Sequence, residues 1–207
     1  MAAMRDKPGK FPSVKVIWWI HTLLHKRVAA MINELERQLL NFDGSAVSFL
    51  SEARTACKNS PSYLDDLVVL CFDPRPAVSD GATWILKAEL NDCMNLPPEL
   101  TERIIHSLCS IQSWQAALHL CQLVEKLNLT SAQADCFIEW AQTYASHSRP
   151  FLRAWSLHAR VILGNRFPEY SHEAELALQA AEGDGAASVS ARARQLRKLL
   201  ALQGRKK

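Results

Sequence analysis

Histidines are the residues of this sequence whose types and spacing could carry acid–base or metal chemistry. His21 and His25 lie four residues apart, which would put both imidazoles on one face of a helix, as a pair of metal ligands requires. No carboxylate lies between them to serve as a base, and the spacing suggests no third ligand, so the zinc-protease pattern is not met. We therefore predict neither a metal nor a cofactor.

Three further histidines, His106, His119 and His158, lie in apolar helical segments, where burial could tune an acid or a base. The sequence offers none of them a positioned partner, and it contains no phosphate-cradling glycine loop and no G-x-S-x-G nucleophile motif. The adjacent carboxylates Asp65 and Asp66 would point about 100° apart on a helix, so they do not converge on one substrate. We predict no catalytic residue, and the sequence favours a protein that is not an enzyme.

Basic residues gather at the two ends of the chain. Through Arg37 there are seven basic and three acidic side chains, and from Arg192 to Lys207 seven basic and none acidic. This leaves 10 of the 24 basic and 18 of the 21 acidic residues in between. The C-terminal segment could contact nucleic-acid phosphates or an acidic partner, and it also fits a solvated last helix whose charges complement the helix dipole.

The elements that must position these residues are predicted to be helices. Glycine is scarce, at 7 of 207 residues, and regularly spaced turn signals leave segments of about 10 to 17 residues, too long for typical strands. These signals lie at residues 43–44, 59–61, 73–76, 95–98, 110–113, 128–131, 146–150, 166–168 and 182–185. About nine helices and an all-α fold follow.

An apolar residue recurs just inside the start of every second helix. It is aligned at Val78, Trp114, Phe151 and Val189, with Ala82, Leu118, Trp155 and Ala193 four residues further on. The separations of 36 to 38 residues are of the order of a two-helix repeat. Each repeat would bury its apolar face against its neighbours.

Three stretches, residues 73–86, 149–163 and 184–196, resemble second-helix segments of HEAT repeats, in which an Asp-containing turn precedes an apolar residue. The resemblance covers Pro61 to Leu202 and implies an α-α superhelix of about four HEAT-like helix pairs, with the subgroup left open. The Arg usual after the aligned Val is replaced by Ser79 and Ser190.

The predicted domain organisation has four parts. Residues 1–12 form a disordered basic N-terminus, 13–60 an N-terminal helical cap, 61–202 the repeat domain and 203–207 a basic tail. The cap comprises predicted helices from Val14 to Leu40 and from Ser45 to Lys58. Its Trp18 and Trp19 fit burial in the cap, or else binding to a partner or a membrane surface.

Cysteine usage indicates the compartment. No two of the six cysteines have the Cys-x-x-Cys spacing of a zinc or redox motif, and most lie among apolar residues in a helical pattern. The segment from Val14 to Ile20 is too short and too interrupted for a signal peptide or a membrane span. We predict a soluble protein in the reducing cytoplasm.

Two classes of function compete. The first is an interaction scaffold whose second helices line a concave surface for a protein or peptide, with Arg153, His158 and Arg192 as predicted groove residues and Arg194 beside them in the basic last helix. The second is nucleic-acid binding or repair, because some HEAT-like proteins are alkylpurine DNA glycosylases; that resemblance implies a basic groove with a catalytic Asp near aromatic residues. The acidic middle argues against such a groove, and a membrane partner is the least favoured.

Overall fold

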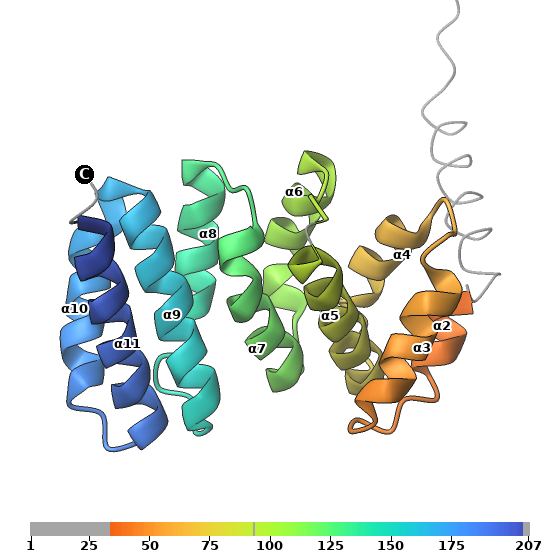
Figure 1. Cartoon of the computed structure of the whole chain (residues 1–207), viewed down its shortest axis with the longest axis horizontal. Helices are drawn as coiled ribbons and strands as arrows, with labels where there is room; N and C mark the ends of the chain where they lie inside the picture. The colour runs from red at the N-terminus through yellow and green to blue at the C-terminus, as the bar shows by residue number, and fades with distance from the viewer. Residues whose placement is uncertain (1–33, 93, 205–207) are drawn as a thin grey trace, which may run out of the picture. The chain divides into compact units, whose positions relative to one another are not determined.

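The structure is a computed structural model that describes residues 34–92 and 94–204, and it is all-α in these residues, as predicted. They form ten α-helices and three short 3-10 helices, with no strand among them (Figure 1). The helices are α2 (Glu34–Leu39), α3 (Val47–Cys57), α4 (Tyr63–Leu70), α5 (Pro76–Asn91), α6 (Pro98–Ser107), η1 (Leu108–Ser110), α7 (Trp114–Leu123), η2 (Val124–Lys126), α8 (Ser131–Gln142), α9 (Pro150–Arg166), η3 (Pro168–Tyr170), α10 (Ser171–Glu182) and α11 (Ala187–Gly204). Each of the nine predicted turns separates two consecutive α-helices.

Local sequence chemistry explains where several helices begin. Pro76, Pro98 and Pro150 each occupy the first turn of a helix, where the fixed proline φ fits and the missing N–H costs nothing. In α8 the Thr130 hydroxyl accepts from the Gln133 N–H at 3.3 Å, and the Gln133 side chain accepts from the Thr130 N–H at 3.0 Å. This reciprocal capping box satisfies two backbone donors that the helix itself leaves open.

One predicted start is early. The Ser60-Pro61 signal precedes α4, but the helix begins at Tyr63, because the Tyr63 N–H closes a turn onto the Ser60 carbonyl at 3.1 Å. The proline therefore stands in the turn and not at the first helical position.

Alternate helices pack on one another in succession. α5 packs on α7, α7 on α9 and α9 on α11, while on the other side α4 packs on α6 and α6 on α8 (Figure 1). A single cluster of buried apolar side chains runs through these helices, from Leu35 to Leu196. Each fully buried Leu or Phe in it stabilises the fold by about 1.5–3 kcal/mol.

The structure shifts the aligned register of the second helices. Phe151 is 53% exposed and Trp114 only partly buried, whereas the third residues of α5, α7, α9 and α11 are all buried. These are Val78, Ala116, Leu152 and Val189, and the residues four further on are buried too, at Ala82, Leu120, Ser156 and Ala193. The spacing of 36 to 38 residues survives, but the side chains that occupy it differ at α7 and α9.

Part of the N-terminal prediction lies outside the described residues, including His21, His25, Trp18, Trp19 and the predicted disordered segment 1–12. Of the first cap helix, α2 is the described part, and it packs with α3 against α5. No helix within the described ranges is long and apolar enough to cross a membrane.

Candidate functional site

The predicted binding residues fall on two different sides of α9. Arg153 and His158 are five residues apart, which corresponds to about 140° around a helix. Arg153 accordingly reaches the loop before α11, whereas His158 faces η2 and lies next to the side chain that meets α11. The structure brings His158 and Arg192 together and leaves Arg153 apart from them. Arg194 is exposed on α11.

Four side chains from three helices form what we call the α9 cluster: Glu125, Trp155, His158 and Arg192. The Arg192 guanidinium lies over the Trp155 ring, 3.9 Å from its centre, and the centres of the Trp155 and His158 rings are 4.8 Å apart in an edge-to-face arrangement. His158 Nε2 lies 3.1 Å from Glu125 Oε1. A cation–π contact of this kind contributes about 0.5–2 kcal/mol.

The electrostatics of the α9 cluster favour a neutral imidazole. Burial lowers the pKa of His158, and the Arg192 charge lowers it further, while Glu125 opposes both. Burial also lowers the pKa of the Arg192 guanidinium, against the pull of Glu125. A neutral His158 can accept or donate a hydrogen bond, but it does not carry a permanent charge into the cluster.

Two buried polar atoms of the α9 cluster have no hydrogen-bond partner among the described residues. They are His158 Nδ1 and Trp155 Nε1. Leaving such an atom unpaired costs about 1–3 kcal/mol, so the fold tolerates a local loss of stability at this position. The stacking of Arg192 on Trp155 offsets part of that cost.

Polar contacts between helices continue from the α9 cluster onto α7 and α5. The Thr83 hydroxyl lies 3.0 Å from His119 Nδ1, and the Lys87 ammonium donates to Gln122 Oε1 at 2.8 Å. Burial lowers the pKa of Lys87 and, together with the Lys87 charge, that of His119 to about 3. We call the partly exposed or exposed residues of this line the cross-helix row: Lys87, His119, Gln122, Glu125, Trp155 and Arg192.

The cross-helix row can bind but has no set of groups for catalysis. It places no nucleophile beside an acid–base pair, since His158 contacts only Glu125 and His119 contacts only a hydroxyl. No group of three or more His, Cys, Asp or Glu in the described part of the chain could hold a metal ion. What the row offers a ligand is a stacked Trp–Arg pair and several amide, ammonium and carboxylate groups.

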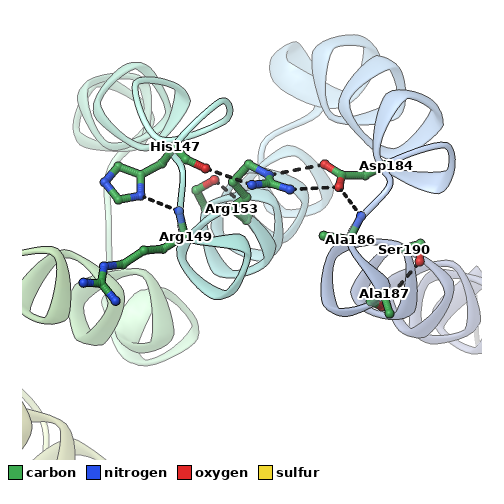
Figure 2. A network of polar contacts seen from close by, with 8 residues as sticks. His147, Arg149, Arg153, Asp184, Ala186, Ala187 and Ser190 are labelled. Atoms are coloured by element: carbon green, nitrogen blue, oxygen red, sulfur yellow. Dashed lines mark hydrogen bonds and ion pairs between the residues drawn. The ribbon is translucent and has the colours of Figure 1, made fainter.

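Arg153 belongs to a separate polar network that links loops (Figure 2). Its guanidinium donates to Asp184 at 2.9 and 3.3 Å and to the His147 carbonyl at 2.9 Å. Asp184 also accepts from the Ala186 N–H at 2.8 Å, and these donors hold its pKa below the usual range. Arg153 thus ties α9 to the segments that precede α9 and α11.

The basic last helix is partly neutralised by its neighbours. Arg197 donates to Glu175 of α10 at 2.5 and 2.7 Å and to Glu182 at 2.8 Å. Arg192 is engaged with Trp155, while Arg194 and Lys198 are exposed. The positive charge available to a partner on α11 is therefore smaller than the sequence count indicates.

Sequence reasoning missed Glu125 and treated Trp155 as a core residue. Glu125 lies in η2, a short helix that no local pattern predicts, and its partner His158 is far along the chain. The four tryptophans of the second half of the prediction divide: Trp140 is buried, while Trp84, Trp114 and Trp155 are partly buried against the core. Only the packing of α9 against α7 and α11 reveals the cluster.

Comparison with known proteins adds no further assignment: no family model matches the chain, and neither a curated protein nor a solved structure does.

Proposed function

We propose that this chain is a HEAT-like helical-repeat scaffold, not an enzyme, and that it binds a protein or peptide through the cross-helix row. The observation that carries the proposal is the succession of α5, α7, α9 and α11, each packed on the next. This succession joins side chains of separate helices into one line of contacts, which suits an extended partner better than a small substrate.

The spacing of buried residues supports the repeat interpretation. Val78, Ala116, Leu152 and Val189 hold the same position in alternate helices and recur every 36 to 38 residues, close to the length of a HEAT unit. The Asp80 carboxylate of α5 accepts from the Ala116 N–H of α7 at 3.1 Å, and Asp184 similarly accepts from the Ala186 N–H before α11. Acidic caps of this kind fix one second helix relative to the next.

The chemistry of the row favours a peptide with an acidic and an apolar or aromatic residue. Arg192 and Trp155 give an aromatic surface with a positive charge over it, and such Trp and Arg pairs are frequent energetic anchors of protein interfaces. Lys87 adds a second ammonium on α5. The two unpaired polar atoms beside Arg192 are further groups that a partner would satisfy on binding.

Nucleic-acid binding of the HEAT-like glycosylase type stays a prediction from the sequence. We do not extend the proposal to it, since Arg197 is held by two glutamates and Arg192 by an aromatic ring.

The proposal is tested by affinity purification of the tagged full-length chain from native cells, with and without nuclease. We expect a stoichiometric protein partner that survives nuclease, and a reduced yield of that partner with Arg192→Gln. The matched control is Arg194→Gln, which removes the same charge from the same helix at an exposed position and should leave the yield unchanged.

Two outcomes would count against the scaffold. One is recovery of nucleic acid alone, with every protein lost on nuclease treatment. The other is an equal response to Arg192→Gln and Arg194→Gln, which would remove the cross-helix row as the binding surface.

A further inference from the structure

A pocket of about 600 Å³ lies between α8 and α10, with α9 as its floor. α8 contributes Ile138 and Glu139, α9 contributes Leu157 and Arg160, and α10 contributes an alanine-rich wall with Leu176 at its edge. Arg153 and Asp184 also line it, and Figure 2 shows this pair bridging from α9 to the loop before α11. The pocket is large enough for several side chains of a ligand.

The floor of this pocket carries two arginines in contrasting states. Arg153 and Arg160 are seven residues apart, two helical turns, and therefore lie on the same side of α9. Arg153 has a bidentate ion pair with Asp184. Arg160 has no hydrogen bond and no carboxylate within ion-pair distance among the described residues, and Glu173 acts on it only at longer range.

The partial burial of Arg160 makes this lack of a partner costly. Burial lowers the pKa of its guanidinium, because the surrounding protein replaces part of the water that would stabilise the charge. A guanidinium presents its donors in a planar fork that matches a carboxylate. A ligand carboxylate at Arg160 would therefore supply what Asp184 supplies to Arg153.

The rest of the pocket is apolar at its floor and wall and acidic at its edge. Leu157 is buried at the floor, and Leu176 is 50% exposed, a high value for a leucine beside a pocket. Glu139 and Glu173 are exposed, so basic groups that flank the ligand carboxylate would meet opposite charges. The open edge suits a segment of a larger molecule that lies across α8 and α10.

We propose that this pocket binds a segment of a partner protein that sets an Asp or Glu carboxylate on Arg160 and an apolar side chain against Leu157 and Leu176. Basic residues next to the acid in that segment face Glu139 and Glu173. This surface is separate from the cross-helix row, since Arg160 and His158 point to different neighbours of α9, so the inference does not depend on the proposed function.

The test is selection from a displayed library of random short peptides on the immobilised full-length chain, followed by fluorescence anisotropy with the selected peptides. We expect them to share an acidic residue close to a large apolar one. Arg160→Gln should weaken their binding by about tenfold or more, because it removes the charge-assisted pair. Arg194→Gln is the matched control and should bind as the unchanged chain does.

A second variant separates the pocket from the charge. Ala180 is exposed and lines the pocket, so Ala180→Trp fills the space without entering the core and should abolish binding. Circular dichroism checks that both variants stay folded. Selected peptides that lack an acid, that bind Arg160→Gln or Ala180→Trp undiminished, or that fail to enrich at all would overturn the inference.

Peptides bound in this pocket should bind Arg192→Gln as tightly as the unchanged chain. That result distinguishes the two surfaces, because failure of the cross-helix row affects Arg192 and failure of the pocket affects Arg160.

Discussion

Glu89 connects three helices through its carboxylate. Its side chain is 5% exposed and accepts from Arg54 Nε at 2.7 Å, from Arg54 Nη2 at 3.0 Å and from the Tyr63 hydroxyl at 2.7 Å. The Arg54 guanidinium and the Tyr63 hydroxyl hold the pKa of Glu89 below its usual range, although burial opposes them. The residue is therefore charged at neutral pH and links α3, α4 and α5.

Replacing Glu89 should cost far more stability than replacing its exposed neighbour. Glu89→Gln keeps the shape but leaves the Arg54 guanidinium without its buried counter-charge, and we expect a loss of about 2–3 kcal/mol in the free energy of unfolding in urea. Asp92→Asn removes the other Arg54 partner, which is 65% exposed, and should cost about 1 kcal/mol or less. Equal losses would show that burial of the Glu89 pair does not matter.

His119 makes stability depend on pH. Its pKa is lowered to about 3 in the folded chain, against about 6.5 in the unfolded chain, so between these values the unfolded chain binds the extra proton. The contribution is complete above about pH 6.5 and is lost as the pH falls toward 3.

Urea unfolding at pH 7, 6 and 5 measures this effect of His119. We expect His119→Asn, which keeps a polar partner for Thr83, to lose about 1 kcal/mol less per pH unit than the unchanged chain near pH 5. His158, whose pKa is also lowered, accounts for slope that remains. Identical slopes for the two chains would contradict the assignment.

At the scale of elements, Gly164 sets how closely α9 approaches α10. A methyl group at this position would lie 2.5 Å from Ala174 Cβ and 3.0 Å from the Tyr170 carbonyl oxygen. The carbonyl belongs to the backbone and cannot move aside without shifting η3. Glycine is therefore required here by the approach of the two helices and not by a backbone angle.

Gly164→Ala should destabilise the protein although alanine is the better helix former. We expect overpacking to cost about 1–3 kcal/mol, more than the gain of about 1 kcal/mol in helix propensity, and so a lower midpoint of thermal unfolding. Gly185→Ala is the control, because no heavy atom lies within 4 Å of its added methyl group, and it should change stability little. A stabilised Gly164→Ala would mean that α9 and α10 separate easily.

At the scale of the whole described chain, stability should pass between neighbouring helices. The main contacts of α10 and α11 are with each other and with α9, while α2, α3 and α4 pack on α5. No described element packs the two ends together in this pattern of main contacts. If each helix pair depends chiefly on its neighbours, damage at one end should stay at that end.

Val189→Ala tests this expectation. Val189 is buried at the start of α11, and its truncation should cost about 2 kcal/mol. Hydrogen exchange followed by mass spectrometry should then show faster exchange in α10 and α11, with α4 and α5 unchanged. Uniform acceleration along the chain would indicate a single cooperative unit instead of coupled repeats.

The sequence alone determined the helices and the turns between them, because the signals that end and start a helix are local. Pro98, Thr130 and Pro150 act on the backbone within one turn of their own position, so the structure places those starts where the sequence predicts them. The repeat length also follows from such local marks. Repeat identity, binding function and cytoplasmic location stay predictions.

Tertiary structure decided which side of each helix faces the core and which residues meet. Leu152 is buried where Phe151 had been aligned, because the neighbours of α9 select the buried side. Arg153 is tied to Asp184, 31 residues away, and Arg192 lies over Trp155. Such pairings depend on how separate helices stack, and this is set by the summed packing of many side chains, which no local spacing encodes.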